Sequence, residues 1–306
     1  MPIRNFNEET LTAEVLRRIR GTPNPRLKEI MTSFIRHLHE FVREVQPTQD
    51  EWFQGIQFLT ETGKWCDDKR QEWILLSDTI GVSMLADFIN YGKVGNATES
   101  TVLGPFYVEG APEMQMGANI AGPGTPGEPC AVSGTVKDMK GMPVAGALMD
   151  IWEAQGDGFY DVQKPGGFNA RARFRTGADG KYWFRCVKPT SYPVPHDGPV
   201  GKMLTATGRH PMRPGHLHFK IAAPGFDTLV THLFVRGDEY LDSDAVFGVK
   251  QSLIVDFRKT ASGEFGTRYD FVLKPEGLRK LPAKKNAGKE NAGKKKAKTT
   301  PARKRK

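Results

Sequence analysis

Two histidines separated by one residue, in His216-Leu217-His218, have the clearest capacity for metal chemistry in this sequence. The preceding Arg213-Pro214-Gly215 predicts a turn that starts a strand, and residues i and i+2 of a strand point to the same face. Both imidazoles would then address one ion, although two histidines on a strand face can also be ordinary polar surface. The same triplet at His37–His39 lies in a helical pattern, where the two side chains diverge by about 200° and do not form a chelate.

Two tyrosines are the candidates for the remaining ligands, because no cysteine or carboxylate lies near the histidine pair in the sequence to complete a zinc site. Tyr160 belongs to the glycine-containing run Gly156–Asp161, which follows an apolar strand pattern. Tyr192 lies in Ser191–Pro195, a segment stiffened by two prolines. Taken singly, each tyrosine is more often a structural aromatic with a hydrogen-bonded hydroxyl.

The order of these residues resembles that of the intradiol ring-cleavage dioxygenases. The resemblance rests on Leu103-Gly104-Pro105-Phe106-Tyr107, Asp150-Ile151-Trp152, Tyr160, Tyr192, Gly208-Arg209-His210 and Arg213-Pro214-Gly215-His216-Leu217-His218, and it covers about residues 10 to 275. It implies an enzyme that inserts both atoms of O2 into a catechol-type ring, between the two adjacent hydroxyl-bearing carbons. It also implies one non-haem Fe(III) per chain.

The resemblance assigns roles to individual residues. It implies ferric ligands at Tyr160, Tyr192, His216 and His218, and a charge-stabilising catalytic arginine at Arg213. Tyr192 would be displaced when the diol binds, which makes it catalytic as well as a ligand. Hard Fe(III) favours anionic oxygen donors and lowers the pKa of a phenol from about 10.

His232 marks a departure from the catechol-cleaving members of the family. It stands at the position of the family's glutamine near the metal, and it is assigned to the catalytic group on that basis.

The segments that would wall the substrate pocket resemble the hydroxyquinol branch most closely. The predicted pocket residues are Leu75, Asp78, Val102, Leu103, Gly104, Pro105, Val194, Pro195 and Val246. Asp78 gives a physical reason, because the third hydroxyl of 1,2,4-trihydroxybenzene needs a hydrogen-bond acceptor that catechol does not, although an acid on a helix surface is an equally good interpretation. Catechol or chlorocatechol is the alternative substrate.

Residues 1–100 predict an all-α region, because apolar residues recur at spacings of three and four. One stripe contains Leu27, Ile30, Met31, Phe34, Ile35, Leu38 and Phe41, and a second contains Trp73, Leu76, Ile80, Met84, Leu85 and Phe88. Thr48-Gln49-Asp50-Glu51 predicts a capping box at a helix start. The resemblance implies that this region forms a homodimer and one wall of the pocket.

Residues 101–279 predict a mainly β catalytic domain that holds the iron. Short β-rich runs are separated by glycine and proline, with no helix-period segment between them, which favours an antiparallel β-sandwich. The patterns at Ser133–Asp138 and Asp179–Tyr182 are also typical of prealbumin-like sandwiches. A non-catalytic binding module is therefore a second interpretation.

Residues 280–306 form a lysine-rich, low-complexity tail that predicts disorder. Eleven basic residues and one acid, Glu290, lie from Lys284 to Lys306, so residues 284–306 carry +10; the formal net charge of the whole chain is +9, which leaves about −1 for the rest. The globular part therefore has no net positive charge that would favour binding to nucleic acid. The tail is either a solvated appendage or makes weak, nonspecific, salt-sensitive nucleic-acid contacts.

The first residues lack the apolar core of a signal peptide, and no apolar run approaches the ~20 residues of a membrane helix. We therefore expect a cytoplasmic protein without membrane association, whose partners are a small aromatic diol and O2. Its three cysteines, Cys66, Cys130 and Cys186, are too few for a disulfide framework.

Overall fold

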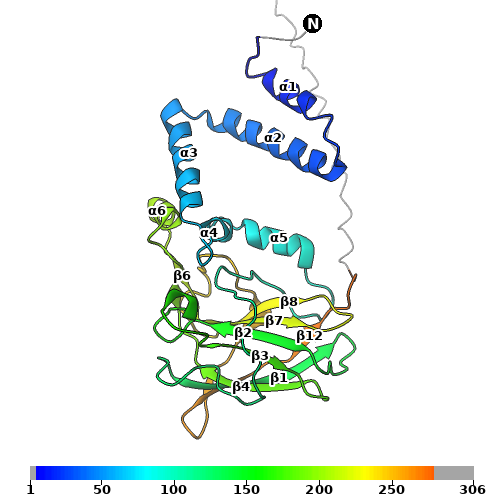
Figure 1. The fold of residues 1–306 in the computed structure, drawn as a ribbon, viewed down its shortest axis with the longest axis vertical. Coiled ribbons are helices and arrows are strands. Elements are labelled where there is room, and N and C mark those ends of the chain that lie inside the picture. The colour runs from blue at the N-terminus through cyan, green and yellow to red at the C-terminus, as the bar shows by residue number, and fades with distance from the viewer. Residues whose placement is uncertain (1–4, 279–306) are drawn as a thin grey trace, which may run out of the picture.

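The computed structural model describes residues 5–278, and Figure 1 shows helices gathered at one end and strands at the other. The predicted basic tail at 280–306 lies outside the described residues. In the N-terminal part the helices are α1 (Leu11–Arg18), α2 (Pro25–Val45), α3 (Gln49–Lys64), α4 (Glu72–Thr79) and α5 (Val82–Tyr91). The predicted helical N-terminal region is confirmed.

Local signals fix where two of these helices begin. α2 starts at Pro25, whose fixed φ suits the first helical position, and the side chain of Asn24 accepts a hydrogen bond from the Leu27 amide. α3 begins with the predicted capping box, in which Thr48 and Glu51 each bond the other's backbone amide.

The first three helices extend away from the strands, whereas α4 and α5 lie close to them (Figure 1). α2 buries none of its own residues within the described chain. The large apolar side chains of α2 and α3 that stand exposed are Leu27, Ile30, Met31, Phe34, Leu38, Phe41, Val42, Val45, Trp52, Phe53, Ile56 and Leu59. None of the helices in residues 5–278 is long and apolar enough to cross a bilayer.

The strands are β1 (Pro129–Asp138), β2 (Leu148–Glu153), β3 (Arg171–Arg175), β4 (Lys181–Val187), β5 (Tyr192–Pro193), β6 (Met212–Arg213), β7 (His216–Ala222), β8 (Leu229–Val235), β9 (Ile254–Val255), β10 (Arg258–Lys259), β11 (Phe265–Arg268) and β12 (Phe271–Leu273). One five-stranded sheet has the order β3-β2-β7-β8-β9. The other has the order β10-β11-β1-β12, with β4 also paired to β1, and β5 pairs with β6 in a small separate sheet.

The prediction of a purely antiparallel sandwich is wrong, because both large sheets are mixed. β1 pairs in parallel with β11 and β12, and β8 pairs in parallel with β9. Side chains alternate in the same way whichever direction a neighbouring strand runs, so the sequence pattern carried no information on these pairings. An eight-residue helix, α6 (Pro199–Ala206), also interrupts the region where no helix was expected.

The main hydrophobic core lies between the two large sheets and determines which way β7 faces. Leu217, Phe219 and Ile221 point into this core with no exposed surface. The alternate residues, His216 and His218, therefore point out of the opposite face of the sheet. They are nevertheless buried, because loops and helices cover that face.

Candidate metal centre

Four side chains bring their donor atoms together on the outer face of β7. The Nε2 atoms of His216 and His218 are 3.1 Å apart. The Tyr160 hydroxyl lies 2.8 Å from Nε2 of His218 and 2.7 Å from the Tyr192 hydroxyl, which lies 3.4 Å from Nε2 of His216. Atoms that share one ion at about 2 Å stand roughly 3 Å apart, so this spacing fits a single metal.

The protonation of the histidines suits metal binding. Burial is the main cause that lowers the pKa of His216 to about 3 and that of His218 well below its usual value, so both imidazoles are neutral. Nδ1 of His216 lies 2.7 Å from the Pro214 carbonyl oxygen, to which it donates, and this leaves a lone pair on Nε2.

The two phenols need a cation to ionise. Burial raises the pKa of both Tyr160 and Tyr192, while the positive charge of Arg213 acts in the opposite direction. A metal ion between the two oxygens would supply the missing stabilisation of the phenolates. Two neutral imidazoles and two phenols are therefore a donor set suited to a hard, highly charged ion such as iron.

Arg213 places a permanent positive charge at the edge of this cluster. Its Nη1 lies 3.1 Å from Nε2 of His216, and β6 pairs it directly with Tyr192 on β5. Burial alone would lower the pKa of Arg213, but the adjacent Asp244 carboxylate raises it, so the guanidinium stays charged.

The comparisons with known proteins agree with this geometry. A family model described as "Dioxygenase" matches residues 102–275, and one described as "Catechol dioxygenase N terminus" matches residues 24–98. The 6-chlorohydroxyquinol 1,2-dioxygenase of Cupriavidus pinatubonensis is 54% identical over 275 residues, covering 89% of this chain and 99% of that protein. The hydroxyquinol 1,2-dioxygenase of Rhizobium sp. (strain MTP-10005) is 55% identical over 262 residues, covering 85% of this chain and 88% of that protein. The chain belongs to the intradiol ring-cleavage dioxygenases.

The solved structure of hydroxyquinol 1,2-dioxygenase from Pseudomonas putida DLL-E4 superposes with a TM-score of 0.81 at 48% identity, covering 88% of this dioxygenase and 99% of that chain. The family uses iron, and the donor set described above fits that metal. Because the family is one of enzymes, the interpretation as a prealbumin-like binding module is set aside.

His232 adjoins the four donors of this dioxygenase. It pairs directly with His218 across β7 and β8, and its ring lies at a steep angle to that of His218, with centroids 4.1 Å apart. It stacks on His216 at 4.7 Å with the planes inclined by 27°, and one ring nitrogen of each of His216, His218 and His232 lies within 4.8 Å of the others. Burial lowers the pKa of His232 well below its usual value, against the opposing effect of a hydrogen bond with the Val102 backbone, so the ring is neutral.

The two tyrosines of the dioxygenase are held very differently. Phe106 stacks on Tyr160 with centroids 4.5 Å apart, and Asp161, the next residue, forms a fully buried ion pair with Arg171. Arg171 also donates to the carbonyl of Phe106, so one guanidinium fixes both neighbours of Tyr160. Tyr192 instead lies on the two-residue strand β5, beside Arg213.

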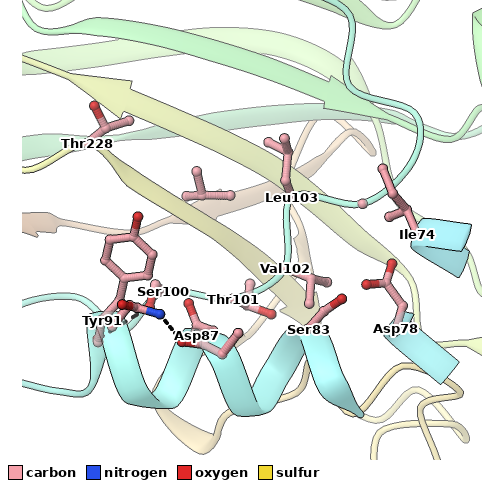
Figure 2. Close-up of a pocket in the computed structure, with 14 residues that line it drawn as sticks. Ile74, Asp78, Ser83, Asp87, Tyr91, Ser100, Thr101, Val102, Leu103 and Thr228 are labelled. Atoms are coloured by element: carbon pink, nitrogen blue, oxygen red, sulfur yellow. Dashed lines mark hydrogen bonds between the residues drawn. The ribbon is translucent and has the colours of Figure 1, made fainter. Parts of the chain in front are cut away.

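The predicted pocket residues divide between an apolar cluster and two cavities. Leu75, Val102, Val194 and Val246 lie together in one buried cluster with Leu76, Met84, Val200 and Leu204. Asp78, Val102, Leu103 and Gly104 line a cavity of about 410 Å³, which Figure 2 shows beside α5. Val194 and Pro195 line a second cavity of about 420 Å³ together with Phe106, and Pro105 lines neither.

None of the four donors is among the residues that line these two cavities, but each cavity is lined by one residue that lies against a donor. Gly104 lines the first, and a Cβ atom added to it would lie 3.5 Å from Cε1 of His218. Phe106 lines the second cavity and stacks on Tyr160. Asp78 reaches the first cavity from α4 and is 2% exposed; burial raises the pKa of its carboxyl to about 6, against the opposing effects of Ser83 and Arg213.

The sequence interpretation missed three buried charged residues around the donors, namely Asp161, Arg171 and Asp244. Asp244 follows Asp242 and Ser243 in a polar run that is typical of a surface loop. Arg171 lies in Arg171-Ala172-Arg173-Phe174-Arg175, where alternation predicts a solvent-facing arginine. No local signal in the sequence distinguishes these buried residues from exposed ones.

Proposed function

We propose that this enzyme cleaves hydroxyquinol between its two adjacent hydroxyl-bearing carbons, giving 3-hydroxy-cis,cis-muconate and its tautomer maleylacetate. The observation that carries the proposal is the buried carboxylate of Asp78, which faces a cavity lined by Val102, Leu103 and Gly104. A third ring hydroxyl can donate to this acceptor, whereas an unsubstituted catechol has no hydroxyl that would do so. Relatives named for hydroxyquinols, at 54–55% identity, support the same substrate.

We also propose that each chain binds one Fe(III) through Tyr160, Tyr192, His216 and His218. When bound, the ion supplies the Lewis acid at which the two adjacent hydroxyls of the diol chelate and through which the ring becomes reactive toward O2. The close spacing of the four donors and their burial support this assignment.

The protein side chains accept a proton from the diol, stabilise its negative charge and hydrogen-bond it in this proposal. The Tyr192 hydroxyl is our candidate to receive a proton from the diol, because the backbone around it carries no anchor comparable to the Asp161–Arg171 pair beside Tyr160. Arg213 stabilises negative charge on the bound diol, as a fixed cation does in a site that excludes water. His232 pairs directly with His218, and a nitrogen of its neutral ring can hydrogen-bond the substrate.

The proposed substrate wall has an apolar and a polar part. Leu75, Val102, Val194 and Val246 form the apolar part, against which an aromatic ring can lie. Asp78 supplies the polar part. The wall is completed in this proposal by Leu103, Gly104, Pro105 and Pro195.

Oxygen uptake by the iron-loaded enzyme tests the substrate. Hydroxyquinol, catechol and a chlorocatechol are compared at equal enzyme concentration, and the ring-opened products are identified by mass. We expect the highest kcat/KM with hydroxyquinol. A strong preference for catechol would overturn the substrate assignment while leaving the family assignment intact.

We further propose that residues 1–100 and 101–279 act as separate units, the first as the homodimer interface. The exposed apolar side chains on α2 and α3 support this, because such a surface is unusual on a monomer. A weak, salt-dependent contact of residues 280–306 with nucleic acid also stays a proposal, which is tested by low-salt DNA retention before and after their removal. The cytoplasmic location stays a prediction.

A further inference from the structure

The Arg213 guanidinium is held by a single carboxylate, that of Asp244. Nε and Nη2 of Arg213 donate to the two oxygens of Asp244 at 2.9 and 3.2 Å. Both side chains are almost completely buried, so the pair is shielded from water and salt. The third nitrogen, Nη1, is left to point at the donor cluster, 3.1 Å from Nε2 of His216.

The backbone of β6 does not fix this orientation. β6 contains only Met212 and Arg213, and it pairs only with the two residues of β5. The two hydrogen bonds from Arg213 to Asp244 fix it instead, because a bidentate pair constrains the plane of the guanidinium.

Asp244 is itself fixed by the loop that follows it. Its carboxylate accepts hydrogen bonds from the amides of Val246, at 3.3 Å, and Gly248, at 2.9 Å. The carbonyl of Gly248 accepts from the hydroxyl of Thr101, which lines the cavity in Figure 2. Asp244 therefore joins Arg213 to Val246, a residue of the apolar cluster that we assign to the substrate wall.

The space around this pair is filled. A Cβ atom added to Gly248 would lie 3.0 Å from Nη2 of Arg213, 3.1 Å from Oγ1 of Thr101 and 3.2 Å from Oδ2 of Asp244. These contacts are tight, so an alanine here would require the guanidinium, the hydroxyl or the carboxylate to move by a few tenths of an ångström.

We propose that Asp244 is a positioning residue of this dioxygenase, which aims the Arg213 guanidinium at the donor cluster and sets Val246 in the substrate wall. It acts through Arg213 rather than by touching the diol. The inference rests on the proposed function, in which Arg213 stabilises charge on the bound diol.

A double-mutant cycle tests the inference. Asp244→Asn keeps the shape of the side chain but removes its charge, and it is made in the parent and in Arg213→Lys. Because displacement of a positioning group by about 1 Å can cost ~10²-fold, we expect kcat per bound iron to fall roughly 10²-fold in the parent. In the Arg213→Lys background the same change should cost less than about threefold, because the residue that Asp244 positions is already altered.

Asp242→Asn is the matched control, since Asp242 lies exposed two residues away in the same loop, and it should keep the parent kcat. Iron content and the visible absorption band are measured for every variant, and the Asp244 variant should retain both. Equal losses in the two backgrounds, or a parent-level kcat per iron with only a lower Tm, would overturn the proposal.

Gly248→Ala decides the question if Asp244→Asn does not fold, because it keeps both charges and only displaces them. We expect at least a ~10-fold loss of kcat per iron, with the iron retained. An unchanged kcat would contradict the proposal. All variants are assayed on whichever diol the parent cleaves best, so an error in the substrate assignment appears in the parent and not in the cycle.

Discussion

The helix α2 and the strand β7 carry similar apolar residues but use them in opposite ways. On β7, Leu217, Phe219 and Ile221 are fully buried between the two sheets, and this fixes the outward direction of the histidines. On α2, Phe34 and Phe41 remain 58% and 55% exposed. The sheet completes its hydrophobic core within one chain, whereas the outer helices do not.

This difference separates two roles within one sequence. All four proposed ligands, Tyr160, Tyr192, His216 and His218, lie in the strand-rich part and depend on its core. The apolar face of α2 lies far along the chain from them, and we assign it to contact with a second copy. Changes in α2 should therefore leave the iron intact, and loss of a ligand should leave association intact.

The largest effect is expected from removing a donor on β7. His216→Ala should lose the iron and the visible band, and activity should fall by at least about 10³-fold, because one of four close-spaced donors is gone. Iron per chain is measured by elemental analysis. His37→Ala, in the exposed helical triplet, is the control and should keep the iron. Full iron content in His216→Ala would contradict the ligand assignment.

Strand periodicity alone was sufficient to place His216 and His218 on one face, because their spacing and the apolar residues Leu217 and Phe219 leave few alternatives. The periodicity of α2 was equally clear, but it could not reveal that no residue of this helix is buried within the described chain. Pairing direction was beyond the sequence, since β11 and β12 would show the same alternation beside an antiparallel neighbour. The helix α6 was missed because it has only eight residues and contains Gly201, so its apolar periodicity is too short to recognise.

The centre itself was predicted unevenly. The resemblance named the four donors and Arg213, which the structure brings together. The buried partners Arg171 and Asp244 were missed, because whether a charged side chain is buried depends on contacts distant in the sequence, such as that between Arg171 and Phe106.

The next effect concerns α2 and should leave the iron untouched. Phe34→Glu together with Phe41→Glu puts two charges on the proposed dimer face. Each phenylalanine contributes roughly 1.5–3 kcal/mol when buried, so association should weaken by at least about 10²-fold. Light scattering across a dilution series measures the mass. Arg36→Glu, a charge reversal outside the apolar stripe, is the control, and a parent-like dimer in the double variant would exclude this face as the interface.

A smaller effect is expected at Asp78, where a helix contributes to the chemistry of the sheet. Asp78→Ala should lower kcat/KM for hydroxyquinol. The loss should correspond to roughly 0.5–3 kcal/mol of transition-state stabilisation, the range for a lost neutral or charged hydrogen bond. Catechol, which has no third hydroxyl, should be affected little. Parallel assays with both diols measure the difference, and equal losses would mean that Asp78 has only a structural role.

The pH dependence should give the smallest effect. Burial raises the pKa of Asp78 to about 6, so the carboxyl is mostly neutral at pH 5 and mostly ionised at pH 7. The ratio of kcat/KM for hydroxyquinol to that for catechol should therefore rise as the pH passes through about 6, by no more than the loss caused by Asp78→Ala. Taking the ratio cancels titrations common to both substrates. In Asp78→Asn the ratio should be flat, and a persistent rise there would assign it to another group.

Isotope labelling tests whether this enzyme inserts both atoms of O2 between the two adjacent hydroxyl-bearing carbons. The iron-loaded enzyme is given hydroxyquinol under ¹⁸O2, and the ring-opened product is analysed by mass spectrometry. We predict a product that carries both heavy oxygen atoms and that results from cleavage between the two adjacent hydroxyl-bearing carbons. Cleavage outside that bond, or a product with no heavy oxygen, would contradict it.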